Sequence, residues 1–199
     1  DYSWWKVSSL ASVDFSKEVV SIPRRGDKIV VYLMDSGVEL THPEFVGRNV
    51  SNLFSLNGDF TDTKGHGTAL ASLIVGNTCG LSDATLKSVK IFDVNQPTLL
   101  SDLVHAFDTI ITDFTANGSK PSTVNMSWNI DENSYIDSKI VQLAALGLKL
   151  VAAAGNSGIP IPNITPAGSP VVYTVGAYNQ QLAPCDFSNY TDPSIISLT

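Results

Sequence analysis

The sequence is poor in the residues that several functional classes need. Lysine and arginine number 12 against 19 acidic residues, giving a net charge of −7 over 199 residues, so we expect no nucleic-acid partner. No apolar run approaches the ~18 residues that cross a bilayer, so we expect no membrane span. No glycine-rich phosphate loop of the required spacing follows a strand, which argues against a nucleotide enzyme.

Cysteine is also scarce. Cys79 and Cys185 are the only two, and this count is equally compatible with one disulfide or with two free thiols. Asparagine is informative through its Asn-x-Ser/Thr sequons, which occur at Asn49, Asn117, Asn125, Asn163 and Asn189. We expect Asn125 to be inaccessible within a strand, and Asn117 and Asn163 to lie in turns, as acceptor sites do. The sequons favour a glycoprotein that is secreted or lies in the lumen of the secretory pathway.

The dominant pattern is an alternation of apolar strands with amphipathic helices. We expect strands over 28–34, 85–92, 122–127, 148–154 and 171–175, and helices near 66–76, 100–116 and 133–146. Strands that alternate with helices of this length predict an α/β fold with a doubly wound parallel sheet. Ligands bind beyond the carboxyl ends of such strands, and Asp35, Ser127 and Asn156 all fall there.

Asp35 ends an apolar strand within Leu-Met-Asp-Ser-Gly. A carboxylate in this position is partly desolvated and needs a hydrogen-bond donor as its partner. A cap on the following turn, made with the local backbone, explains the same position. The spacing alone does not decide between a functional partner and a local cap.

His66 is the most distinctive of the three histidines. It lies between two glycines in Gly65-His-Gly-Thr68 and precedes an apolar segment of helical character, which leaves its ring open to a substrate. By contrast, His42 precedes a proline in a turn and His105 lies on a helix among polar positions. Taken alone, each of the three is more often a surface residue than a catalyst.

The specific signal is the order of several segments along the chain. They are Asp35–Phe45, Gly65–Thr68, Asn125–Ser127, Ala152–Asn156, Thr165–Pro170, Val175–Ala177 and Phe187–Tyr190. In this order they resemble the aspartate, histidine, substrate-strand, oxyanion and later segments of the subtilisin-like serine proteases, or subtilases. The beginning of the chain, with Trp4 and Trp5, resembles the mature amino terminus of the proteinase K branch.

The resemblance implies a serine endopeptidase and a role for each matched residue. Asp35 orients the imidazole of His66, which acts first as general base towards a serine and then as general acid towards the leaving amine. Asn156 donates a side-chain N–H to the oxyanion. The substrate cleft is implied to consist of Ser127, Trp128, Asn129, Ala152, Ala153 and Gly155. This chemistry needs no metal and no cofactor.

One part of the family pattern is missing. The serine of subtilases lies in a Gly-Thr-Ser-Met-Ala segment, and the sequence ends at Leu198-Thr199 without one. We therefore expect residues 1–199 to be a single subtilisin-like catalytic domain, truncated at its carboxyl end and inactive alone. Its partners would be a polypeptide substrate or a carboxyl-terminal partner fragment left by processing. Since the serine helix of subtilases packs on the sheet, we expect Val30, Leu33, Val151 and Ala153 to be partly uncovered.

Further departures affect substrate and metal binding. Trp128-Asn129-Ile130 replaces a leucine and two glycines, which leaves less room for a peptide backbone. Pro97 removes a backbone donor from the edge that would pair with substrate. The calcium loop of the family is not recognisable at 76–80, so we expect no calcium, although Glu44 lies where some relatives supply a ligand.

Two interpretations therefore remain open. The first is a serine endopeptidase that is active in a longer or two-chain form, and the intact Asp35, His66 and Asn156 favour it. The second is a non-catalytic subtilase-like protein with a binding or structural role, and the altered substrate strands favour it. Intact mass of the parent protein, or the residues that follow in its reading frame, would discriminate between them.

Overall fold

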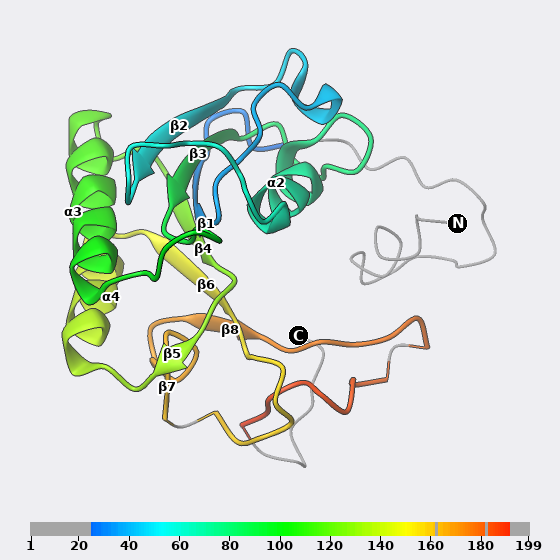
Figure 1. Cartoon of the computed structure of the whole chain (residues 1–199), viewed down its shortest axis with the longest axis vertical. Coiled ribbons are helices and arrows are strands. Elements are labelled where there is room, and N and C mark those ends of the chain that lie inside the picture. The colour runs from blue at the N-terminus through cyan, green and yellow to red at the C-terminus, as the bar shows by residue number, and fades with distance from the viewer. Residues whose placement is uncertain (1–24, 162, 182, 192–199) are drawn as a thin grey trace.

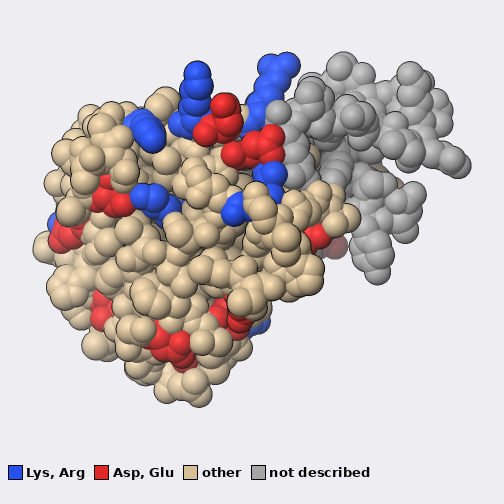
Figure 2. Space-filling model, turned by 90° about the horizontal axis from the view of Figure 1, so that it is seen from above, with Lys and Arg blue, Asp and Glu red and all other residues tan. Residues whose placement is uncertain are grey.

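A computed structural model describes residues 25–161, 163–181 and 183–191 of the chain. The resemblance noted at Trp4 and Trp5 lies outside these residues, as do Leu198 and Thr199. Within the described part, the helices are all too short or too polar to traverse a lipid bilayer. Acidic and basic side chains are interspersed on the face that Figure 2 shows, and the basic ones do not merge into one continuous patch.

A six-stranded parallel sheet forms the centre of the molecule (Figure 1). Its strands, in spatial order, are β2 (Val50–Ser55), β3 (Thr85–Lys90), β1 (Val30–Asp35), β4 (Ser122–Met126), β6 (Lys149–Ala153) and β8 (Tyr173–Val175). A second, antiparallel pair joins β5 (Ile130–Asp131) to β7 (Ile164–Thr165). The expected α/β class with a parallel sheet is thus confirmed.

Helices cover the two faces of the sheet unequally. The α-helices are α2 (His66–Val75), α3 (Leu100–Ala116) and α4 (Ser134–Ala145), and Pro43–Phe45 forms the short 3-10 helix η1. Figure 1 shows α3 and α4 together on one face and α2 on the other. All three helices agree with the expected spans to within one residue at each end.

Alternating residues of β1 divide the core into two layers. Tyr32 and Met34 belong to a cluster with Phe107 and Ile110 of α3, and side chains of α4 complete it. Leu33 belongs to a second cluster beneath α2. Every residue of β1 is buried, as expected for a central parallel strand covered on both sides.

Of the four residues expected to be partly uncovered, Val30 and Leu33 are buried, so for these two the expectation was wrong. Val30 is 6% and Leu33 1% exposed, because the α3/α4 layer covers the first and α2 covers the second. Val151 and Ala153 of β6 are indeed only half-buried, since α2 contacts β1 and β3 but does not extend over β6. The same face continues across β8, where Tyr173 is 63% and Val175 54% exposed.

Candidate active site

The carboxylate of Asp35 lies at the carboxyl end of β1 and is 1% exposed. Its Oδ1 accepts a hydrogen bond from the Ser36 backbone N–H at 2.7 Å and lies 2.8 Å from Nδ1 of His66. The sequence left two alternatives for Asp35, a cap on the local backbone or a contact with a functional side chain. The structure shows both, the first with Ser36 and the second with His66. The second oxygen, Oδ2, is buried without a partner among the described residues.

His66 is the first residue of α2, and its side chain is 55% exposed. With Nδ1 facing the carboxylate, the other ring nitrogen, Nε2, is the one left to exchange a proton with a substrate group. The two flanking glycines have different tasks. Gly65 has a φ of +75°, a conformation that favours glycine, while a Cβ on Gly67 would overlap the carbonyl oxygen of Gly37.

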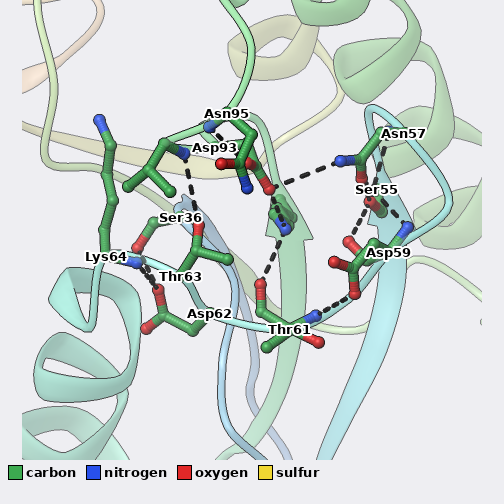
Figure 3. Close-up of polar contacts among 12 residues, drawn as sticks. Ser36, Ser55, Asn57, Asp59, Thr61, Asp62, Thr63, Lys64, Asp93 and Asn95 are labelled. Carbon is green, nitrogen blue, oxygen red and sulfur yellow. Dashed lines mark hydrogen bonds and ion pairs between the residues drawn. The ribbon is translucent and has the colours of Figure 1, made fainter.

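Asp62 links the Asp35 turn to the beginning of α2 (Figure 3). Its Oδ1 accepts from the Ser36 hydroxyl at 2.8 Å and from the Gly65 N–H at 2.9 Å, and its Oδ2 accepts from the Thr68 N–H at 2.9 Å. The Ser36 hydroxyl oxygen in turn accepts from the Gly67 N–H at 2.9 Å. Two backbone N–H groups in the first turn of α2, which have no partner within the helix, are thus satisfied from outside it.

Asp62 and Ser36 were missed by the sequence analysis. Each resembles an ordinary turn residue, and an aspartate shortly before a helix start was the only signal that pointed to a cap. Burial raises the pKa of the Asp62 carboxyl, but the hydrogen bonds from Thr68, Ser36 and Gly65 outweigh it and hold the pKa below its usual value. The group is therefore ionised, which suits its position at the positive end of the α2 dipole.

A buried ion pair supports the loop that contains Asp62 (Figure 3). Nζ of Lys90 lies 2.7 Å from Asp93 Oδ2, and the two side chains are 0% and 1% exposed. The same ammonium donates to the carbonyl oxygen of Thr61 at 2.7 Å, immediately before Asp62. Because Lys90 is also the register partner of Asp35 in β3, the pair fixes this loop against the strand end that carries the carboxylate.

A separate open groove of about 320 Å³ lies at the carboxyl ends of β4, β6 and β8. Ser127, Ala152, Ala153, Gly155 and Asn156 all line it, together with Asn125, Val151, Ala154 and the segment 175–177. Asn156 is exposed in the loop after β6. Asp35 and His66 do not line this groove.

The other two expected cleft residues are Trp128 and Asn129, whose side chains are more enclosed. The Trp128 side chain is 6% exposed in the α3/α4 layer of the core, where its ring packs edge-on against Phe92 at 6.3 Å. The Trp128 side chain is therefore not exposed to the groove, and only the backbone of this residue is free to contact a substrate. Asn129 is half-buried, and its side-chain amide lies beside Gly155, which lines the groove.

These features can be compared with known proteins. The family model described as "Subtilase family" matches residues 26–196. The chain belongs to the subtilase family. The Asp35–His66 contact and the groove lie within the matched residues. The structure of a cold-adapted subtilisin-like serine proteinase is similar to this chain, with a TM-score of 0.79. That match has 26% identity and covers 87% of this chain and 63% of the other.

Two curated relatives of the chain come from fungi. Alkaline protease 1 of Aspergillus clavatus is 35% identical over 161 residues, which is 80% of this chain and 40% of that protein. Subtilisin-like protease 2 of Trichophyton rubrum is 33% identical over 181 residues, which is 89% of this chain and 42% of that protein. The chain thus spans about two fifths of the length of these relatives.

The remaining sequence candidates differ in their surroundings. Cys79 and Cys185 are both free thiols. Glu44 accepts backbone N–H groups from Thr78 at 2.9 Å and Cys79 at 3.3 Å. Among the sequons, three are exposed, at Asn49, Asn117 and Asn163. Asn125 is half-buried and Asn189 is 5% exposed.

The Lys90–Asp93 pair predicts how this subtilase domain responds to acid. The hydrogen bond from Lys90 is the main cause that lowers the pKa of Asp93 to about 2, from the usual value near 3.9. A carboxyl whose pKa is lower in the folded state stabilises that state above its usual pKa, and this contribution disappears as the pH falls through about 2. We expect the free energy of unfolding of the whole protein to fall steeply between about pH 4 and pH 2.

The variant Lys90→Met tests this assignment, because it leaves Asp93 without its counter-charge and returns the pKa of Asp93 towards its unfolded value. Urea unfolding followed at a series of pH values should give a shallower acid dependence than in the wild type. Lys139→Met is the matched control, since its partner Asp108 is half exposed. Equal slopes in Lys90→Met and in the wild type would show that the pair does not govern acid stability.

Proposed function

We propose that the whole protein to which these 199 residues belong is a serine endopeptidase. The observation that carries the proposal is the 2.8 Å contact between the buried Asp35 carboxylate and Nδ1 of the exposed His66. The family supports peptidase chemistry in general, since the relatives named above are proteases. The roles of the individual residues are part of the proposal.

In the proposed mechanism, Asp35 holds the tautomer of His66 that carries its proton on Nδ1. Nε2 then takes the proton of a serine hydroxyl as the serine oxygen attacks the peptide carbonyl. The carboxylate stabilises the imidazolium that results, and His66 returns the proton to the leaving amine as the C–N bond breaks. The low exposure of Asp35 strengthens this ion pair, because water screens it poorly.

The groove beyond β4 and β6 is the proposed place for the substrate. Ser127, Ala152, Ala153 and Gly155 offer backbone groups and small side chains along it, and Asn156 is the proposed side-chain donor to the oxyanion. Trp128 and Asn129 contribute through their backbone or by shaping the wall. No cofactor and no metal take part in the proposed chemistry.

The serine itself is proposed to come from a segment outside these 199 residues, on the same polypeptide or on a partner fragment, because no Gly-Thr-Ser-Met-Ala segment occurs in the sequence. The half-buried Val151 and Ala153 and the exposed Val175 line the groove, and they form one apolar surface with the exposed Tyr173 beside it. Covering such a surface stabilises a fold by ~25 cal/mol per Å², which suits it to receive that segment. The three exposed sequons support secretion as a glycoprotein.

The alternative is a non-catalytic subtilase that binds rather than cleaves. A specific observation favours it: Trp128, Asn129 and Ile130 occupy positions where the family pattern has a leucine and two glycines. The Trp128 side chain fills the core and the Asn129 amide lies against Gly155, so both are committed to internal packing.

Peptide hydrolysis by the whole protein tests the proposal. We expect the purified protein to cleave unfolded casein, and a peptidyl phosphonate that reacts with nucleophilic serines to label it covalently and stop cleavage. Heat-denatured protein treated with the same phosphonate is the control for nonspecific labelling. A folded, full-length protein that neither cleaves casein nor reacts with the phosphonate would support the non-catalytic alternative.

A further inference from the structure

Asn189 belongs to a sequon, yet its side chain is withdrawn from solvent. The residue is 5% exposed. Its Oδ1 accepts backbone N–H groups from Ser157 at 3.0 Å and Ile159 at 3.2 Å, and its Nδ2 donates to the Ala154 carbonyl oxygen at 2.9 Å. An amide that is buried and bonded in this way is closed to glycan attachment, so its presence has another explanation.

All three partners of the Asn189 amide belong to one loop. Residues 154–159 follow β6 and contain Asn156, while Asn189 lies more than thirty residues further along the chain. The backbone makes the same connection, since the Asn189 N–H donates to the Gly155 carbonyl at 3.0 Å and the Gly158 N–H donates to the Phe187 carbonyl at 2.8 Å. The two segments therefore lie side by side below the sheet in Figure 1.

Gly155 shows how closely the amide fits this loop. Its φ is +105°, which disfavours any side chain, and a Cβ built on it would overlap Nδ2 of Asn189. Asn156 is the next residue, and its side chain has no hydrogen-bond partner among the described residues. The direction in which Asn156 presents its amide therefore depends on the backbone on either side, which Asn189 holds.

We propose that Asn189 is a positioning residue that holds the loop 154–159 so that Asn156 can donate to the oxyanion. The inference rests on the proposed function, since it assigns Asn189 to the same reaction. A donor to the oxyanion is worth ~10²–10³ in kcat when it is correctly placed. A displacement of about 1 Å is enough to lose much of that benefit.

A double-mutant cycle in the whole protein tests the inference. We expect Asn189→Ala to lower kcat about 10-fold, a fraction of the full loss of one donor, with little change in KM. In the Asn156→Ala background the same substitution should cost less than about 2-fold, because the group it positions is already absent. A merely structural role would lower activity by the same factor in both backgrounds.

The chain offers a matched control for the loss of a buried turn amide. Asn179 also uses its Oδ1 to accept two backbone N–H groups, from Gln181 at 2.9 Å and Ala183 at 3.1 Å, but it is exposed in another turn. Asn179→Ala should leave kcat and KM unchanged. If Asn189→Ala fails to fold, Asn189→Asp takes its place in the cycle. It keeps the Oδ1 acceptor, but it also sets a buried carboxylate oxygen against the Ala154 carbonyl, so the coupling is taken from the difference between the two backgrounds.

The outcomes separate the two proposals. Loss of kcat that vanishes in the Asn156→Ala background supports the positioning role. Additive losses in an active enzyme overturn that role and leave the proposed function intact. A folded wild-type protein without any peptidase activity overturns the proposed function, and the inference with it.

Discussion

Replacement of His66 by alanine is expected to lower the kcat of the whole protein by about 10⁶-fold, the loss typical of removing the base from an Asp-His-Ser triad. The physical reason is that Nδ1 is held 2.8 Å from the buried Asp35 carboxylate, which leaves Nε2 of this imidazole to take and return the proton in the proposed mechanism. The loss of stability should be far smaller than the loss of kcat, because the His66 side chain is 55% exposed and the Asp35 carboxylate keeps the Ser36 N–H as a donor. The measurement is kcat on a chromogenic peptide, beside thermal unfolding of the same sample.

His105→Ala provides the matched control for this substitution. His105 is also exposed, but it lies on α3, across the sheet from α2. The His105→Ala variant should retain wild-type kcat and KM. If His66→Ala keeps activity within about tenfold of the wild type, His66 is not the base. Loss of a triad base leaves far less activity than that.

The second large effect is expected from Gly67→Ala, which adds one methyl group between α2 and the Asp35 turn. The new Cβ would overlap the carbonyl oxygen of Gly37, a backbone atom that cannot rotate away. The helix start must therefore move, and we expect a cost of about 1–3 kcal/mol in the free energy of unfolding. His66 moves with the helix start, so kcat should fall by about 100-fold or more.

The control for Gly67→Ala is Ala69→Ser, which adds one atom to the exposed face of the same helix. Urea unfolding and kcat should both remain close to wild type in this variant. The informative comparison is between the two variants, in the change of kcat and in the change of the free energy of unfolding. Wild-type kcat in Gly67→Ala would mean that the close approach of the two backbones does not set the Asp35–His66 geometry.

Most of the sheet was predictable because apolar residues mark its buried strands. β1, β3, β4, β6 and α2 to α4 lie within a few residues of their expected spans. β2 was not predicted, since Ser51, Asn52 and Ser55 interrupt its apolar pattern. It pairs only with β3 at the edge of the sheet, and all its residues are half-buried, so less apolar surface is needed there.

The site was predictable only as far as local motifs reach. The order of segments led to Asp35, His66 and Asn156, but not to Asp62 or Asn189. Asp62 binds Ser36, 26 residues away, as well as residues of the nearby helix start, and the side-chain partners of Asn189 lie 30 to 35 residues away. Hydrogen bonds between such distant residues leave no periodic pattern in a sequence.

The Trp128 assignment had an available signal. Val124 and Met126 are core residues of β4, so the strand period of two already directs position 128 towards the same layer. Asn125 and Ser127 alternate with them and line the groove. The motif indicates the segment, whereas strand alternation decides which of its side chains reach the groove.

The strand order β2-β3-β1-β4-β6-β8 affects the order in which parts of the site are completed during translation. After β1 the chain forms β2 at one edge of the sheet, then β3 between β2 and β1, and it then builds the other half with β4, β6 and β8. Every side chain and N–H that binds Asp62 lies between residues 36 and 68, whereas the loop of Asn156 waits for residue 189. During synthesis from the amino terminus, Asp35, His66 and all these partners of Asp62 are therefore translated long before the loop of Asn156 gains its support from Asn189.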